Sequence, residues 1–247
     1  MTWEEAALGV DVSHWQPEVD WTTLRAGGVT FAVLKATQGT ALRDACFIPH
    51  LEGARTAGLR VGAYHWCDPI RPAIPQADHF LRTIHAQPLD FLAIDVEQQW
   101  ASWREWEQRH VVRLISPERI SRVAQAVAQR VRAATGLPVL IYTRVSFIAE
   151  FARPMLTWLG AWPLWLAQYP YPRGRITCTW EALRTHFLPT AARPVLPPGC
   201  ATWQMWQFSA GRFILPGVPA PLDLNLFNGT PAAFEAWLAQ ERVGGTA

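Results

Sequence analysis

The segment Phe91-Leu92-Ala93-Ile94-Asp95-Val96-Glu97 is an apolar run that ends in two acids. The run predicts a buried strand, and because side chains alternate along a strand, Asp95 and Glu97 would share one face, roughly 6 to 7 Å apart at Cα. Two carboxyl groups that close do not ionise independently, so one is pushed toward its protonated form while the other stays anionic. Cleavage of a glycosidic bond needs that division of roles. Two solvated acids on an edge strand are the commoner explanation of such a pair, so the rest of the chain has to decide.

Seven further segments are typical of strands, because each is rich in apolar, β-branched or aromatic residues and is bounded by Gly, Pro or polar turns. They are residues 8–13, 29–35, 59–66, 137–142, 163–169, 202–208 and 221–225. The first and the last of them each carry an acid, Asp11 and Asp223. With the strand before Asp95 they make eight expected strands.

The longer connections between these segments are typical of helices. Residues 44–57 and 75–86 are amphipathic, residues 116–135 open with Ser, Pro and Glu and stop at Gly136, and residues 231–242 form an expected last helix. Strand and helix in alternation predict a parallel sheet, and eight strands predict its closure. Since the later connections are short or irregular, we expect an α/β fold, an irregular TIM-like barrel with eight strands and fewer than eight helices.

Seven short blocks of sequence carry further information. They are Gly9-Val10-Asp11-Val12-Ser13 with Gln16, Phe31-Ala32-Val33-Leu34-Lys35-Ala36-Thr37, Gly62-Ala63-Tyr64-His65, Ile94-Asp95-Val96-Glu97, Leu164-Trp165-Leu166-Ala167-Gln168-Tyr169, Trp206-Gln207-Phe208 and Leu222-Asp223-Leu224-Asn225. Each block is weak alone, but in this order, across residues 9–229, they resemble the glycoside hydrolase family 25 lysozymes. The resemblance implies an N-acetylmuramidase, which cleaves the β-1,4 bond between N-acetylmuramic acid and N-acetylglucosamine in peptidoglycan.

The resemblance also implies roles for individual residues. Carried over by motif, Glu97 looks like the general acid, Asp95 like its partner, and Asp11 and Asp223 like the flanking acids of the pocket. Six further residues fall in blocks that line the same groove in the family: Lys35, Tyr64, His65, Tyr169, Trp206 and Gln207. No cofactor is implied.

The chemistry of the reaction agrees with these roles. Glycoside cleavage passes through a cation-like sugar, so the site needs an acid for the leaving oxygen and an anion near the anomeric carbon. We expect the negative field of the other three acids to hold Glu97 protonated. Asp95 would stay ionised and stabilise either the cation or a cyclic intermediate formed by the 2-acetamido group of the substrate. Direct displacement by water, which inverts the configuration, is an open alternative.

Two positions depart from the family pattern: Gln38, where Glu is common, and Trp66, where Phe is usual. Neither is one of the four acids, but both bear on substrate binding and on the pH optimum. Two other functions therefore remain as hypotheses. One is a catalytically silent glycan-binding protein on the same scaffold, for which the 14 tryptophans would suffice. The other is a glycosidase that acts on another amino-sugar polymer such as chitin.

Two segments look like insertions in a single catalytic domain that spans residues 1–247, with no separate binding module. The first, residues 98–115, would lie on the catalytic face of a barrel. Its Trp100, Trp103 and Trp106 could stack on sugars or pack against the barrel, and the helical spacing of the last two favours packing.

The second insertion, residues 170–201, is rich in Pro and Arg and includes a short helix expected at residues 180–187. Cys178 and Cys200 lie near its ends, and a disulfide between them would staple the segment, with two reduced thiols as the alternative. Cys46 and Cys67 are expected to be small buried apolar residues. None of the four has the spacing of a zinc site, so no metal is expected.

The composition is typical of a globular enzyme. The formal charge of +2, with basic residues dispersed, gives no case for a nucleic-acid partner. The most apolar stretch, residues 155–167, is shorter than the roughly 20 residues that span a bilayer, so no membrane insertion is expected. We expect a monomer that acts on peptidoglycan strands at the cell wall. Because residues 1–5 show no secretory signal, it would arrive there either after removal of a signal or, like an endolysin, by phage-type release.

Overall fold

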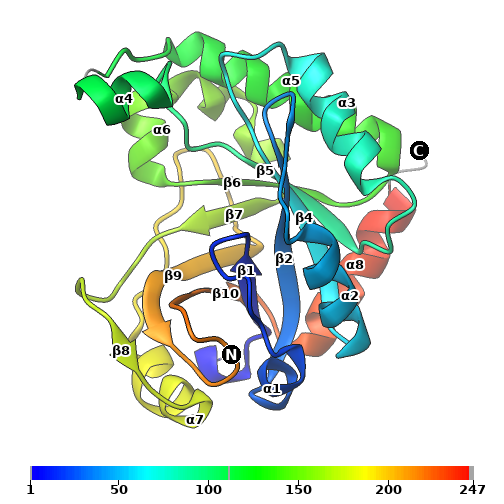
Figure 1. Ribbon diagram of the computed structural model, residues 1–247, viewed down its shortest axis with the longest axis vertical. Coiled ribbons are helices and arrows are strands. Elements are labelled where there is room, and N and C mark those ends of the chain that lie inside the picture. Colours follow the sequence, from blue (N-terminus) through cyan, green and yellow to red (C-terminus); the bar gives the residue numbers. More distant parts are fainter. Residues whose placement is uncertain (1, 111, 245–247) are drawn as a thin grey trace.

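Eight strands close into a barrel in the computed structural model, which describes residues 2–110 and 112–244 (Figure 1). They are β1 (Leu8–Val12), β2 (Val29–Gln38), β4 (Arg60–Trp66), β5 (Phe91–Asp95), β6 (Val139–Thr143), β7 (Leu164–Ala167), β9 (Met205–Ile214) and β10 (Leu222–Phe227). The barrel closes because β1 pairs with β2 on one side and with β10 on the other. Two short strands lie outside the barrel: β3 (Leu42–Arg43) pairs with the end of β2, and β8 (Ile176–Thr177) pairs with the end of β9. The expected fold class is confirmed.

The barrel is mixed because its last strand, β10, runs antiparallel to both of its neighbours. The pairs β1–β2, β2–β4, β4–β5, β5–β6, β6–β7 and β7–β9 are parallel, whereas β9–β10 and β10–β1 are antiparallel. A parallel pair needs a long crossover, but antiparallel strands can be joined by a short loop. Residues 215–221, between β9 and β10, are such a loop. The irregularity expected at the end of the chain therefore lies in strand direction.

Helices cover the outside of the barrel and one of its ends. They are α1 (Trp21–Ala26), α2 (Phe47–Thr56), α3 (Ala73–Ile84), α4 (Trp103–Arg109), α5 (Pro117–Thr135), α6 (Val145–Phe151), α7 (Trp180–Ala182) and α8 (Pro231–Gly244). Shorter 3-10 turns occupy Trp3–Glu5, Arg153–Thr157, Leu159–Ala161 and Leu188–Thr190, and one π turn occupies Leu183–Phe187. The described residues thus form eight α-helices, and the expectation of fewer than eight is corrected. Helices α1 and α6 were not expected, because six or seven residues are too few to show a helical period.

Two hydrophobic clusters follow from the alternation of side chains along the strands. One fills the barrel interior and includes Phe91 and Ala93 of β5, while the other lies between the barrel and its helices and includes Leu92 and Ile94. Residues two apart on β5 therefore share a side of the barrel wall. At the N-terminal end of the strands, Phe234 of α8 packs on Phe91 and closes the interior cluster.

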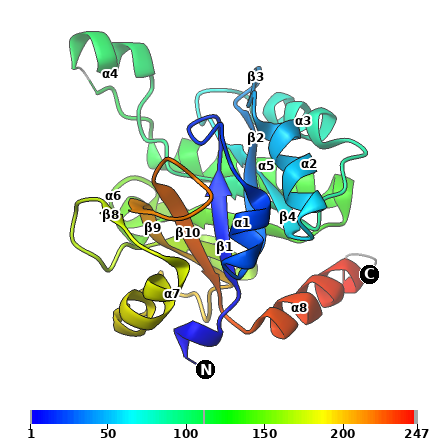
Figure 2. The same cartoon turned by 60° about the horizontal axis from the view of Figure 1, so that its bottom comes forward.

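The first insertion extends away from the barrel, and its helix α4 projects from the rest of the molecule (Figure 2). Trp100 lies at its base, with its ring 6.5 Å from that of Trp66. The side chains of Trp103 and Trp106 are outside the described part of the structure, so their packing stays a prediction.

The second insertion contains β8 and α7, and the helix expected at residues 180–187 is found as α7 followed by the π turn. All four cysteines are free thiols, so of the two alternatives for Cys178 and Cys200 the structure has the reduced pair and no bridge between them. The segment is held without it, since the Tyr171 hydroxyl donates to the carbonyl of Phe187 at 2.9 Å. No helix within residues 2–110 and 112–244 combines the length and the apolar character needed to cross a membrane.

Candidate active site

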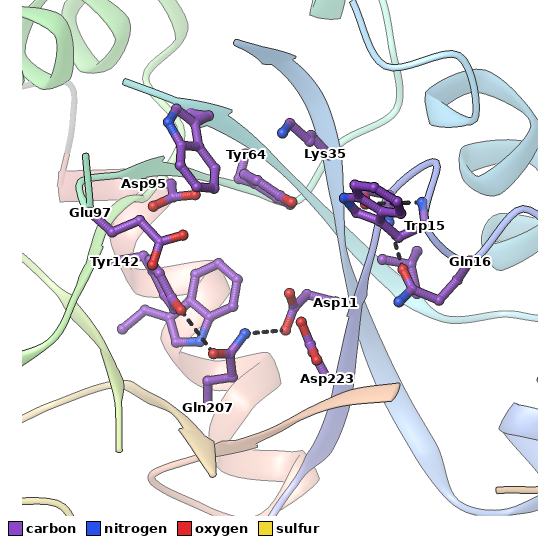
Figure 3. A pocket seen from close by; sticks show the side chains of 14 residues that line it. Asp11, Trp15, Gln16, Lys35, Tyr64, Asp95, Glu97, Tyr142, Gln207 and Asp223 are labelled. Carbon is purple, nitrogen blue, oxygen red and sulfur yellow. Dashed lines mark hydrogen bonds between the residues drawn. The ribbon is translucent and has the colours of Figure 1, made fainter. Parts of the chain in front are cut away.

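A cavity of about 160 Å³ opens at the mouth of the barrel, where the parallel strands end (Figure 3). All four acids singled out in the sequence line it: Asp11, Asp95, Glu97 and Asp223. They come from β1, from the end of β5 and from β10, and Figure 3 shows Asp95 beside Glu97 and Asp11 beside Asp223. Strand β5 itself ends at Asp95, and Glu97 lies two residues beyond it.

Burial dominates the electrostatics of Asp95 and Glu97. It raises the pKa of Asp95 well above its usual value, and the negative charge of Glu97 raises it further. Burial also raises the pKa of Glu97, against the opposing effect of Arg144, whose Nη2 lies 4.0 Å from Glu97 Oε2. The pair therefore retains a proton to higher pH than an ordinary carboxyl group. From the sequence we expect neighbouring charges to raise the pKa, but loss of hydration is the larger cause.

One oxygen of Asp95 is left without a partner. Its Oδ1 is buried and accepts no hydrogen bond from any of the residues that the structure describes. A buried oxygen in this state costs free energy unless a donor reaches it. Because it belongs to a side chain that lines the cavity, a ligand can supply that donor.

Asp11 and Asp223 are direct cross-strand partners on β1 and β10. Burial raises the pKa of Asp11 to about 6, while hydrogen bonds from the side-chain amides of Asn225 and Gln207 limit the rise. These amides donate to Asp11 Oδ2 over 2.7 Å and 2.9 Å. The pKa of Asp223 lies well above its usual value because of burial and then of the Asp11 charge, although the Gly211 amide donates to its Oδ1 at 2.7 Å. The two acids thus form a second coupled pair.

Gln207 connects these acids to two tyrosines. The hydroxyl groups of Tyr142 and Tyr169 each donate to Gln207 Oε1 at 2.8 Å, and its Nε2 faces Asp11. Burial raises the pKa of both phenols, so both remain protonated donors at neutral pH. The amide is held in one orientation as a result.

Lys35 and Tyr64 line the opposite wall of the cavity. The Lys35 ammonium donates to Gln38 Oε1 at 3.0 Å and lies 4.9 Å from the centre of the Trp66 ring. Burial lowers its pKa, and the charges of Asp95, Asp44 and Glu97 partly restore it. Both departures from the family pattern, Gln38 and Trp66, thus contact the same ammonium group.

Three residues expected in the groove do not line this cavity: His65, Tyr169 and Trp206. On β4, Tyr64 and Trp66 face the cavity, so His65 points outward, where it bonds Thr37 and Gln76 and burial lowers its pKa to about 4. On β9, Gln207 faces inward, so Trp206 joins the outer cluster. Tyr169 does not line the cavity but contacts its lining through Gln207. Strand parity explains the first two differences.

Several residues at the cavity were not singled out from the sequence. Trp15, whose side chain is 74% exposed, lines it from the loop after β1, and Tyr142 and Trp165 line it from β6 and β7. Arg144 follows β6 directly. Their positions at the carboxyl ends of barrel strands were a usable signal. Within the described residues, no group of three or more His, Cys, Asp or Glu side chains is arranged to hold a metal ion.

Comparison with known proteins gives consistent matches. The sequence profile of Glycosyl hydrolases family 25 matches residues 10–217. Lysozyme M1 of Streptomyces globisporus is 30% identical over 230 residues, which cover 91% of this chain and 68% of that protein. An N,O-diacetylmuramidase of a Chalaropsis species is 26% identical over 181 residues, which cover 70% of this chain and 82% of that protein. The structure of the bacterial lysozyme from Streptomyces coelicolor matches with a TM-score of 0.74 at 25% identity and covers 96% of this chain and 98% of its own.

Proposed function

The chain belongs to glycosyl hydrolases family 25, and on this basis we propose that its four-acid cavity is the active site, with Glu97 as the general acid. The protein is a glycoside hydrolase of the lysozyme type, a muramidase that hydrolyses peptidoglycan. The observation that carries the assignment of the site is the convergence of Asp11, Asp95, Glu97 and Asp223 on one cavity.

Glu97 is the better placed of the coupled pair to donate a proton. It is half-buried and its carboxyl group points into the cavity, whereas Asp95 is 4% exposed (Figure 3). Burial raises the pKa of Glu97, so it keeps its proton to higher pH than an ordinary glutamic acid does. After the glycosidic bond breaks, the same carboxylate can take a proton from the attacking water.

Asp95 acts through its unpartnered oxygen. The acetamido N–H of a muramic acid residue in the cavity supplies the donor that Oδ1 lacks. A hydrogen bond to the charged form of a carboxyl group lowers its pKa. Substrate binding therefore favours the anion at Asp95 and leaves the shared proton on Glu97. The anion then stabilises the cyclic intermediate that forms when the acetamido oxygen attacks the anomeric carbon.

This route predicts that hydrolysis retains the anomeric configuration. Attack by the acetamido oxygen inverts the carbon once and attack by water inverts it again. NMR spectroscopy of the first product formed from a defined glycan oligomer would therefore show the β anomer before mutarotation. An α anomer as first product would instead establish direct displacement by water.

Substitution of Glu97 by Gln tests the assignment of the acid. The change keeps the shape of the side chain and removes its transferable proton, so peptidoglycan hydrolysis should fall on the order of 10² to 10⁴-fold. Mass spectrometry of the released fragments should show muramic acid at the new reducing ends for the wild type. Glu52→Gln, at an exposed position of α2, is the matched control and should keep full activity. Activity of Glu97→Gln within a few-fold of the wild type would remove Glu97 from the role.

The other hypotheses gain no support from the two named relatives, Lysozyme M1 and the N,O-diacetylmuramidase. Glucosamine at the new reducing ends in the same experiment would favour the chitinase-like hypothesis, and the absence of any new ends would favour the silent binder. The substrate places the action of the enzyme at the cell wall. We propose that it acts there as a monomer, because one chain supplies all four acids. The release route, by secretion or by phage-type lysis, stays a hypothesis.

A further inference from the structure

A second cavity, of about 300 Å³, lies between the segment that follows β7 and the second half of β9. Figure 1 shows β7, β8 and β9 side by side at this edge of the barrel. The catalytic site does not use this cavity, and its wall contains Arg173, Arg175, Arg212 and Ser209. None of its lining residues is acidic.

The three arginines have uncompensated charges. Within residues 2–110 and 112–244, no ion pair involves any of them. Arg173 and Arg175 are exposed, so their guanidinium groups are free to reach a ligand. A cluster of positive charge with no acid in its wall attracts an anion.

Arg212 and Ser209 distinguish this cavity from a chance cluster of surface charge, because both place buried polar groups in its wall. The Arg212 guanidinium donates to the carbonyls of Pro172 and Gly174, which fixes it, and its Nε is buried without a partner. Ser209 is 2% exposed, and its Oγ is also buried without a partner among the described residues. The hydroxyl and the guanidinium N–H are both donors without a partner, and a carboxylate accepts hydrogen bonds from groups of this kind.

Hydrogen bonds connect the lining of the second cavity to that of the active site. Tyr169 lines the second cavity and its hydroxyl donates to Gln207, which lines the first. Gly211 also lines the second cavity, and its amide donates to the catalytic-site acid Asp223. The two cavities are therefore neighbours, connected by the Tyr169–Gln207 and Gly211–Asp223 hydrogen bonds.

We propose that the second cavity binds a carboxylate of the peptide stem that muramic acid carries in peptidoglycan. The inference rests on the proposed function, because the stem is attached to the muramic acid that would bind at the four acids, and the second cavity is connected to that site through Gln207 and Asp223. The stem is the anionic part of that substrate, and the arginine-lined cavity complements it while the acid-lined cavity complements the cation-like sugar. The site would make the enzyme select glycan with free stem carboxylates.

The experiment compares two soluble glycan substrates of equal length, one with free stem carboxylates and one with the same carboxylates converted to amides. We expect the wild type to cleave the free-carboxylate substrate with about tenfold higher kcat/KM, mainly through a lower KM. Arg173→Gln with Arg175→Gln, and separately Ser209→Ala, should bring the two substrates to the same kcat/KM. Activity on the amidated substrate should stay at the wild-type level in all variants.

Arg82→Gln with Arg122→Gln is the matched control, because it removes two positive charges from exposed positions of α3 and α5. It should leave the preference unchanged. A wild type without preference, or an equal loss of preference in this control, would overturn the proposal. Failure of the proposed function itself looks different, since neither substrate would then yield muramic acid at new reducing ends.

Discussion

Among single residues, Gln207 shows how hydrogen bonds decide what a side chain can do. An amide presents a donor and an acceptor of the same shape, so its orientation depends on its partners. The hydroxyls of Tyr142 and Tyr169 both donate to Oε1, which leaves the amino group to donate to Asp11. This bond favours the anion of Asp11 and offsets part of the effect of burial on its pKa.

Gln207→Glu hardly changes the shape of the side chain, but it should lower the activity of the enzyme strongly. A carboxylate cannot donate to Asp11, and its charge raises the pKa of Asp11 further. We expect kcat/KM on peptidoglycan to fall about tenfold or more at neutral pH, and the acidic limb of the pH profile to move to higher pH. The profile of Gln129→Glu, which adds the same charge at an exposed position of α5, should match the wild type. An unshifted profile for Gln207→Glu would contradict this account.

Among the elements of secondary structure, α5 is one whose two ends are determined by nearby residues. The Ser116 side chain accepts from the Arg119 amide at 3.3 Å, and Pro117 occupies the first turn. At the other end Gly136 adopts φ 62°, the left-handed conformation that ends many helices. Both ends were predicted from the sequence because each depends on residues within one turn of it.

Gly136→Ala should destabilise the protein through its backbone alone. A Cβ at this position meets no atom within 4 Å, so the only cost is the left-handed conformation, about 1 kcal/mol. Urea unfolding would show this loss, and the melting temperature should fall by roughly 2 to 4 °C. Asn tolerates the same conformation, so Gly136→Asn should cost less. Equal losses for Ala and Asn would mean that strain at φ 62° is not the cause.

For the barrel as a whole, burial of four acids at one mouth is a cost to stability. Asp11 has a pKa of about 6 in the fold against an ordinary value of 3.8. Between these values the folded chain binds more protons than the unfolded chain, so stability falls as the pH rises through that window. The difference corresponds to about 3 kcal/mol at most. The fold accepts this cost at the site where the reaction needs coupled carboxyl groups.

Asp11→Asn should reverse this cost while it impairs hydrolysis. We expect its free energy of unfolding, relative to the wild type, to rise between pH 4 and pH 7 by up to about 3 kcal/mol. Removal of the Asp11 charge also eases the ionisation of Asp223. Chemical denaturation at several pH values would measure the trend.

Asp20→Asn is the control of opposite sign. Hydrogen bonds from Thr23 lower the pKa of Asp20, so its contribution is present at neutral pH and is lost as the pH falls. If the difference in unfolding free energy between Asp11→Asn and the wild type did not change with pH, Asp11 would be as well solvated in the fold as in the unfolded chain.

Local order along the chain was readable from the residues themselves. The alternation that puts Asp95 and Glu97 on one side and the caps of α5 depend on neighbours a few positions away. The barrel followed from the succession of strands and helices, and the order of the seven blocks indicated the family. These features need no knowledge of which distant segments meet.

The composition of the active site depends on pairing between strands that are far apart in the sequence. Asp11 and Asn225 are 214 positions apart and come into hydrogen-bonding distance only because β1 pairs with β10. Closure of the barrel also determines which side of β4 and β9 points inward, so Tyr64 and Gln207 face the cavity while His65 and Trp206 do not. It also set the raised pKa values and created the arginine-lined cavity, because loss of hydration and charge proximity are properties of the packed molecule, not of any stretch of its sequence.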